Sequence, residues 1–191
     1  MRLNDEAIRQ LFTDARTLRA WQPHEVPDSL LREIVDLMKL APTASNGLPA
    51  RIVFIKSAPA KARLKPHLDP GNVNQTIAAP ATAIVGYDLK FYMQRPAGER
   101  PIRGLAEKPE EAQAVAFRNG SLQGAYLIMA ARALGLDCGP MSGFDNAGVD
   151  KEFFAGTEIK SNFLCNMGYG DRTGLRPRAG RFAFDEMASI L

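Results

Sequence analysis

Residues 117–145 read FRNGSLQGAYLIMAARALGLDCGPMSGFD and contain the longest apolar run of the chain followed by several turn-forming residues. From Gly124 to Leu136 apolar residues fall on nearly every helical face, a pattern typical of a buried helix. We therefore predict a long central helix over roughly 109–136. The segment GPMSGFD, residues 139–145, is expected to form a rigid elbow, because glycine permits close backbone approach and proline fixes the backbone. A tight surface turn is the simpler alternative.

Two shorter amphipathic helices and three strands are predicted around this stretch. Apolar residues share one helical face in an early segment capped by Asn4 (Ile8, Leu11, Phe12, Ala15) and again in a segment that ends before Pro42 (Leu31, Ile34, Val35, Met38). Short β-branched or apolar runs predict strands at 51–55, 81–87 and 162–170. Strands interleaved with helices indicate a layered α/β or α+β fold, and the pattern alone does not choose between them.

The composition favours one domain over residues 1–191, because 46% hydrophobic residues can build a substantial core. The net charge of +3 comes without a block of Lys or Arg, so we expect no nucleic-acid partner. The N-terminus does not resemble a secretory signal and no apolar run reaches the ~20 residues of a membrane span, so we expect a cytoplasmic protein. Cys138 and Cys165 are expected to be buried thiols, and the two histidines are not spaced as metal ligands.

The segment 88–108, DLKFYMQRPAGERPIRGLAEK, is polar and contains two prolines and two aromatic residues. Its composition predicts an excursion or lid rather than a linker between domains.

Two polar stretches are candidates for binding, and a third is rejected as a dinucleotide site. Arg16, Thr17 and Arg19 supply two guanidinium groups and a hydroxyl within four residues, a set that can hold a phosphate and a carbonyl oxygen; a solvated helix end is the alternative. The loop in 41–54, APTASNGLPARIVF, opens into a strand and can present donors to a ligand, although a plain connection is equally consistent. The third, GYGDRTG at 168–174, lacks the third glycine of a dinucleotide fingerprint.

No nucleophile elbow, P-loop or zinc-protease pattern occurs in the chain. Without an obvious nucleophile or general base, any chemistry is expected to belong to a bound cofactor, so no catalytic side chain is assigned.

Four elements in order resemble the nitroreductase family of flavoenzymes over nearly the whole chain. They are the early Arg and Thr element, the Pro-Thr-x-x-Asn-x-x-Pro loop, the Pro-x-x-Gly-Phe-Asp elbow, and the closing Gly-Tyr with its basic tail. Within this family, the sequences PARIVF, KSNFLCNMGYGD and residues 117–145 most resemble the malonic semialdehyde reductase branch, which acts in bacterial pyrimidine degradation.

The resemblance implies an α+β, three-layer fold with a central, mostly antiparallel sheet flanked by helices, and a homodimer with FMN in two interface clefts. The resemblance also implies roles for residues at the matching positions of this sequence. Arg16, Thr17 and Arg19 resemble the elements that hold the FMN phosphate and the N1/O2 edge of the ring. Pro42, Thr43 and Ala44 match residues that reach the flavin from the partner subunit. Asn46 matches a ligand on the same protomer, Asn72 faces the pyrimidine edge, and Pro140, Met141, Ser142 and Gly143 lie beside the reactive N5. Arg176 and Arg178 match a late basic pair at the phosphate.

Some positions depart from the family pattern. Leu48 and Ala50 flank Pro49 where many relatives carry Gln and an aromatic residue. Gln75 stands where many place a lysine near the flavin O2, so Arg19 is the main cation expected to stabilise the reduced ring. Ala15 stands where an arginine often opens the early element.

The resemblance further implies an NAD(P)H oxidoreductase that reduces its flavin and then a small electron acceptor at one shared pocket. For malonic semialdehyde, reduced to 3-hydroxypropionate, the acceptor carboxylate needs a cation. Arg95, Arg100 and Arg103 are candidates, with solvated surface charges as the alternative. Phe91 and Tyr92 are candidates to cover the substrate, with core or interface packing as the alternative. A broad nitroaromatic or quinone reductase and a non-catalytic flavin-binding module are the competing functions.

Overall fold

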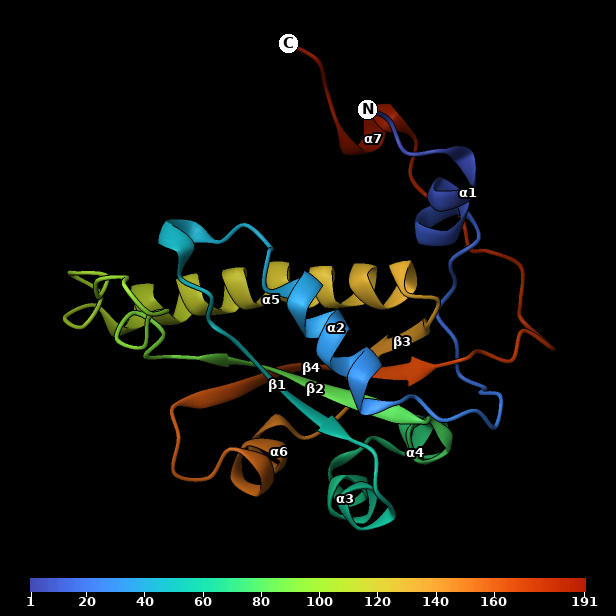
Figure 1. Cartoon of the computed structure of the whole chain (residues 1–191), viewed down its shortest axis with the longest axis horizontal. Coiled ribbons are helices and arrows are strands. Elements are labelled where there is room, and N and C mark those ends of the chain that lie inside the picture. The colour runs from blue at the N-terminus through green and yellow to red at the C-terminus, as the bar shows by residue number, and fades with distance from the viewer.

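The computed structural model describes residues 1–191 and is built on a four-stranded antiparallel sheet with the order β1-β2-β4-β3 (Figure 1). The strands are β1 (Ala50–Ile55), β2 (Ala81–Asp88), β3 (Asp137–Met141) and β4 (Ile159–Gly168). Every neighbouring pair of strands is antiparallel, as predicted for the central sheet. All eight residues of β2 are buried, because this central strand is covered on both faces.

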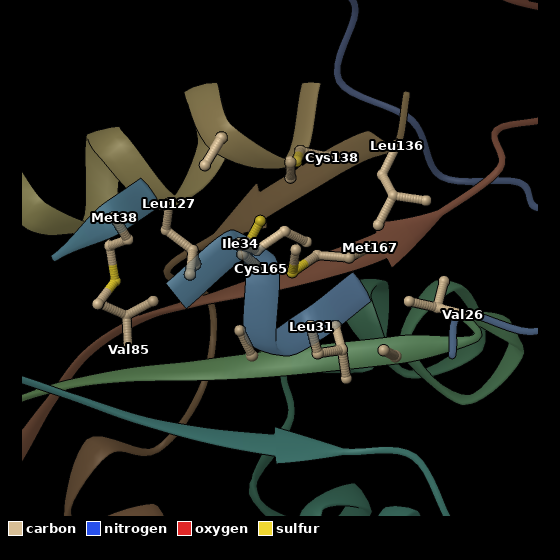
Figure 2. Close-up of a cluster of buried hydrophobic side chains, with 14 residues drawn as sticks. Val26, Leu31, Ile34, Met38, Val85, Leu127, Leu136, Cys138, Cys165 and Met167 are labelled. Carbon is tan, nitrogen blue, oxygen red and sulfur yellow. The ribbon is translucent and has the colours of Figure 1, made fainter. Parts of the chain in front are cut away.

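Helices α2 (Asp28–Met38) and α5 (Pro109–Ala133) cover one face of the sheet (Figure 1). Leu31, Ile34 and Met38 of α2 lie in a buried cluster with Val85 and other side chains from that face, shown in Figure 2. The burial follows from sequence, because these three apolar residues repeat at the spacing of one helical face. The central helix predicted at 109–136 is confirmed, with its end at Ala133.

Helix α5 lies unusually close to the sheet. A Cβ atom at Gly124 would lie 2.6 Å from Phe163 Cε1, and one at Gly120 would lie 2.9 Å from Tyr87 Cβ. Since real Cβ atoms do not approach this closely, the two glycines set the distance between the helix and the strands.

Helices α3 (Ala58–Leu64), α4 (Pro70–Ala78) and α6 (Asn146–Phe153) lie on the other face (Figure 1). Ile84 of β2 and Leu164 of β4 point to this second face and pack with Leu64 and Val149. The neighbours of Ile84 in β2, Ala83 and Val85, belong to the first cluster, as expected from the alternation of a strand. The molecule therefore has the three layers expected from the resemblance.

The segment 88–108 begins with the last residue of β2, and residues 89–108 contain turns but no helix or strand. Phe91, Tyr92 and Leu105 pack against Ala112 and Ala116 at the start of α5. This third buried cluster anchors the segment to the end of α5 that lies far from the chain termini (Figure 1).

The chain ends hold less regular structure. Helix α1 (Asp5–Ile8) continues as the π-helical turn η1 (Arg9–Thr13), so the predicted first helix ends before Ala15. The predicted cap is confirmed, since Asn4 Oδ1 accepts from the amide of Ala7 at 2.8 Å. The short α7 (Phe184–Met187) belongs to a tail that extends away from the sheet after β4, and α7 lies beside the N-terminus (Figure 1). None of the helices combines the length and the apolar content of a membrane span.

Two predictions about strands need correction. The third predicted strand, 162–170, spans Ile159–Gly168 instead. The elbow predicted at 139–145 begins inside β3, because Gly139, Pro140 and Met141 pair with β4. Proline is tolerated there because β3 is an edge strand and needs no amide donor on its open side.

Candidate functional site

The segment that carries Arg16, Thr17 and Arg19 runs alongside β3. The amide of Leu18 donates to the carbonyl of Cys138 at 3.0 Å, and Thr17 and Cys138 form a parallel bridge. A Cβ at Gly139 would collide with the carbonyl oxygen of Leu18, so glycine is required for this approach. Arg19 and Thr17 are exposed and Arg16 is half-buried, which leaves all three polar groups accessible to a ligand.

The C-terminal segment binds back to these early residues. Arg178 Nη2 donates to the carbonyls of Thr13 and Ala15, each at 2.7 Å. Arg16 Nη2 donates in return to the carbonyl of Arg176 at 2.6 Å. The structure therefore brings the early and late arginines together, although about 160 residues of sequence separate them.

Arg172 adds a further contact that the sequence analysis did not foresee. Its guanidinium donates to the carbonyl of Asp14 at 3.0 Å and to Asp137 Oδ1 at 2.9 Å. Asp137 Oδ2 also accepts from the amide of Gly170 at 3.2 Å. These contacts fasten the chain that leaves β4 to the start of β3.

A cavity of about 430 Å³ opens between the two segments and is lined by Arg16, Thr17, Arg19, Asp171, Thr173 and Arg176, among others. Three guanidinium groups face one carboxylate, so the lining is net positive. Donors from Thr173 hold the pKa of the Asp171 carboxyl below its usual value; the amide of Thr173 donates to Asp171 Oδ1 at 2.8 Å. Guanidinium groups bind phosphate through paired hydrogen bonds, so this cavity suits a phosphate-bearing ligand.

The elbow after β3 is held by polar side chains of α4. Asn72 Nδ2 donates to the carbonyl of Gly143 at 2.8 Å, and Gln75 Nε2 donates to Asn72 Oδ1 at 2.6 Å. Trp21 Nε1 donates to the carbonyl of Gln75 at 3.0 Å, which ties the segment after Arg19 to the same helix. A Cβ at Gly143 would lie 2.6 Å from Asn72 Nδ2, so a side chain there would push this network apart.

Met141 is fixed by a buried polar chain beneath the elbow. Thr76 Oγ1 contacts Met141 Sδ at 3.5 Å and accepts from Asn166 Nδ2 at 3.2 Å, and Thr82 Oγ1 donates to Asn166 Oδ1 at 2.7 Å. Thr76, Thr82 and Asn166 are fully buried. A satisfied buried network of this kind allows a single arrangement of its members, so the position of Met141 is well defined.

The loop with Pro42, Thr43, Ala44 and Asn46 lies elsewhere. It sits beside the first half of α5, whereas the segment 16–19, which contributes to the lining of the arginine cavity, runs near the other end of that helix (Figure 1). The amide of Ala44 donates to Asn119 Oδ1 of α5 at 2.8 Å. One protomer therefore presents two separate groups of predicted residues, and Asn46 lies with the loop rather than with the arginines.

Asn119 holds this loop and Gln123 holds the start of β1 that follows it, and both residues were missed in the sequence. Gln123 Oε1 accepts from the amide of Ala50 at 2.9 Å, next to the bond between Asn119 and Ala44. The available signal was their polarity on the buried face of an otherwise apolar helix, four residues apart.

The candidate substrate residues of the 88–108 segment differ in their placement. Phe91 is fully buried and Tyr92 is 9% exposed, so the packing alternative describes them better than a cover over the substrate. The Arg95 side chain is only 4% exposed and donates to the carbonyls of Ser45 and Asn46, which corrects its assignment as a free cation for a substrate. Arg103 is exposed.

Two further hollows, of about 570 and 540 Å³, lie along α2 and β1 and beside α3. Asp28 and Lys56 line both, and they pair with each other there. Because the opposite charges neutralise each other, these hollows carry less of the positive charge that distinguishes the arginine cavity.

Known proteins with similar sequences or similar structures show which family the chain belongs to. The nitroreductase family model matches residues 13–169. A Burkholderia lata protein that is provisionally named NADH dehydrogenase/NAD(P)H nitroreductase is 56% identical over 193 residues, with 98% of each chain covered. A provisionally named nitroreductase in complex with FMN from Exiguobacterium sibiricum has a TM-score of 0.84 at 20% identity, over 100% of this chain and 99% of its own.

A third similar protein is a provisionally named NAD(P)H:FMN oxidoreductase from Staphylococcus epidermidis, with a TM-score of 0.84 at 19% identity, over 100% of this chain and 98% of its own. The two solved structures share the fold of this chain at low identity, while the family model covers most of its length. The chain belongs to the nitroreductase family.

Proposed function

We propose that the protein is an FMN-dependent NAD(P)H oxidoreductase. The observation that carries the proposal is the cavity lined by Arg16, Arg19 and Arg176. The FMN phosphate carries nearly two negative charges at neutral pH, and guanidinium groups are well suited to bind it. The names of similar proteins, which mention NAD(P)H and FMN, support the same cofactor and co-substrate.

The residues around the cavity fit this group. Arg16 and Arg176 would hold the phosphate, and Arg19, which is exposed and adjacent to β3, would face the edge of the ring where negative charge develops. Residues 140–143 would place main-chain atoms beside the flavin ring, because Gly143 has no side chain that would intrude on it. When bound, FMN supplies hydride transfer between NAD(P)H and an electrophilic acceptor. The chain itself would bind and orient the reactants, and we assign it no nucleophile or general base.

We further propose that the protein works as a homodimer in the cytoplasm. Leu122 and Tyr126 of α5, four residues apart on one face of the helix, are 46% and 43% exposed and form an apolar surface on a central helix. A second copy packed on this face would cover it and would bring the 42–46 loop of one protomer near the arginine cavity of the other. Leu122→Glu is expected to give a monomer that retains little flavin. A dimeric Leu122→Glu protein with full flavin content would contradict the α5 interface.

Malonic semialdehyde is the acceptor that we propose, on the basis of the sequence resemblance described above. With Arg95 engaged by the 43–48 loop, Arg100 and Arg103, which are both exposed, are the candidate cations for the acceptor carboxylate. The names of similar proteins favour a broad nitroaromatic reductase as the second candidate. If kcat/KM for semialdehydes is no higher than for simple quinones, the dedicated acceptor is wrong.

The decisive experiment compares FMN with riboflavin, which lacks the phosphate. The wild-type protein should bind FMN much more tightly than riboflavin, and anaerobic NADH or NADPH should bleach the bound flavin. Arg19→Met and Arg176→Met test the cavity, with Arg181→Met as a control, because the Arg181 guanidinium donates only to the carbonyls of Ala179 and Gly180. Arg176→Met should reduce this preference for FMN. Equal affinity for FMN and riboflavin in the wild type would overturn the phosphate site, and bound flavin that is not bleached would indicate a non-catalytic flavin-binding module.

A further inference from the structure

The 43–48 loop holds an uncommon backbone conformation. Ser45, Asn46 and Leu48 have φ angles of 52°, 51° and 47°, in the left-handed region that favours glycine. Three such residues within four positions carry an energetic cost, and they persist only where their surroundings enforce the conformation. Strained backbone of this kind is concentrated at ligand sites, so the contacts that enforce it in this loop are informative.

Arg95 contacts two of the three strained residues directly, whereas the carbonyl of the third, Leu48, accepts from Arg51 Nη1 at 3.0 Å. The Arg95 guanidinium donates to the carbonyls of Ser45, at 2.8 Å, and Asn46. It also donates to the carbonyl of Arg100 at 3.3 Å and pairs with Glu99 at 3.2 Å. The side chain is 4% exposed, so its charge depends on these acceptors.

Other contacts hold the ends and the underside of the loop. Leu48 donates its amide to Thr43 Oγ1 at 3.2 Å, and Ala44 is held by Asn119. A Cβ at Gly47 would lie 2.8 Å from Phe91 Cε2, so the loop rests directly on this buried ring. Arg95 and Phe91 both belong to the 88–108 segment. This segment therefore contacts the loop twice, through the Arg95 guanidinium and through the Phe91 ring.

We propose that Arg95 is a positioning residue that fixes the 43–48 loop in the shape needed to contact the flavin bound by the partner subunit. The inference rests on the proposed function, and it assigns Arg95 a role different from binding substrate. If Arg95 is lost, the carbonyls of Ser45 and Asn46 lose their shared donor and the strained residues relax. The loop then no longer closes the flavin site from across the interface.

The test measures the FMN dissociation constant, kcat and KM of the full-length protein and its variants. Arg95→Met keeps most of the side-chain length but removes the donors, and we expect the FMN dissociation constant to rise roughly tenfold to a hundredfold, as for the loss of hydrogen bonds from a charged group. Arg95→Lys should restore part of the affinity, because an ammonium group can still donate to one or both carbonyls. Lys108→Met removes an exposed cation from the same segment, one that pairs only with Glu111 of α5, and it should leave the constant unchanged.

The outcomes separate a positioning role from a merely structural one. An Arg95→Met protein with a lower melting temperature but wild-type FMN affinity, kcat and KM would overturn the proposal. If Arg95→Met does not fold, Gly47→Ala tests the same loop, since its Cβ must displace the loop from Phe91 while Arg95 stays in place. A raised FMN dissociation constant in Gly47→Ala supports the proposal and an unchanged constant overturns it. A wild-type protein that takes up no FMN would overturn the proposed function as well.

Discussion

Arg178 Nη2 donates to the carbonyl of Ala15 at 2.7 Å and thereby ties the C-terminal segment to the residues that begin the arginine cavity. The same nitrogen donates to Thr13, and Arg16 donates back to the carbonyl of Arg176. These hydrogen bonds are charge-assisted and run in both directions, so each segment stabilises the other. The position of Arg176 at the cavity therefore depends on Arg178, although Arg178 does not line the cavity.

We predict that Arg178→Ala weakens FMN binding by about 2 kcal/mol, the size of hydrogen bonds from a charged group. The loss is expected because the tail no longer holds Arg176 in place. Quenching of FMN fluorescence on titration with protein gives the dissociation constant. Arg181→Ala is the control, since its guanidinium contacts only its own neighbours in the tail. Equal dissociation constants for Arg178→Ala and wild type would show that the tail does not position the site.

The parts of the fold that the sequence predicts well are those with clear periodicity. Helices α2 and α5 and strands β1 and β2 lie close to where the apolar patterns put them, because each buries a regular set of side chains. Strand β3 was missed because Gly139 and Pro140 normally mark a turn. It forms because an edge strand tolerates proline, and Gly139 lets the carbonyl of Leu18 approach its open side closely.

The site was predictable only in part, for a different reason. The resemblance to the nitroreductase family implies that the early and late arginines act together, and the structure brings them together at one cavity. The role of Arg95 was not predictable from the sequence. No local pattern indicates that an arginine in a polar segment will be buried and will donate to the carbonyls of Ser45 and Asn46. Tertiary partners decide whether a charged side chain is free to bind a ligand.

The two cysteines are predicted to be inert in the folded protein. Cys138 and Cys165 are fully buried, and the contact with Cys138 together with burial raises the pKa of Cys165. The thiolate is the reactive form of cysteine, so a raised pKa and burial both slow its reaction. A thiol reagent such as dithionitrobenzoate should therefore label neither residue in native protein and both after unfolding in guanidinium chloride. Rapid labelling of one native thiol would show that β3 opens easily.

The stability of the turn at Asp171 should depend on pH. Its pKa is lowered in the folded state by the amide and hydroxyl of Thr173, so its stabilising effect is present above the unfolded value of about 3.9 and is lost as pH falls through the folded value. An NMR titration of the Asp171 carboxyl should place its pKa below that of an unfolded peptide. In Thr173→Val the pKa should rise, because the hydroxyl donor is lost while the amide donor remains. An unshifted wild-type pKa would contradict the hydrogen bonds at this turn.

The elbow gives the sharpest test of the geometry around the site. In Gly143→Val the new Cβ would lie 2.6 Å from Asn72 Nδ2 and 2.7 Å from Asp69 Oδ2, so both side chains must move. Asn72 would then lose its bond to the carbonyl of Gly143, and the backbone beside the proposed flavin would shift. We expect FMN affinity to fall by about 1.4 kcal/mol or more, the cost of one or more lost hydrogen bonds.

Gly71→Ala is the matched control for this prediction, because it lies on the same helix one residue from Asn72 and its Cβ would meet nothing within 4 Å. Alanine is also the better helix former, so this variant should be at least as stable as wild type and bind FMN equally well. The melting temperature of each variant separates a loss of folding from a loss of binding. A Gly143→Val protein with wild-type flavin content and turnover would show that the close contact of the elbow with Asn72 has no part in the site.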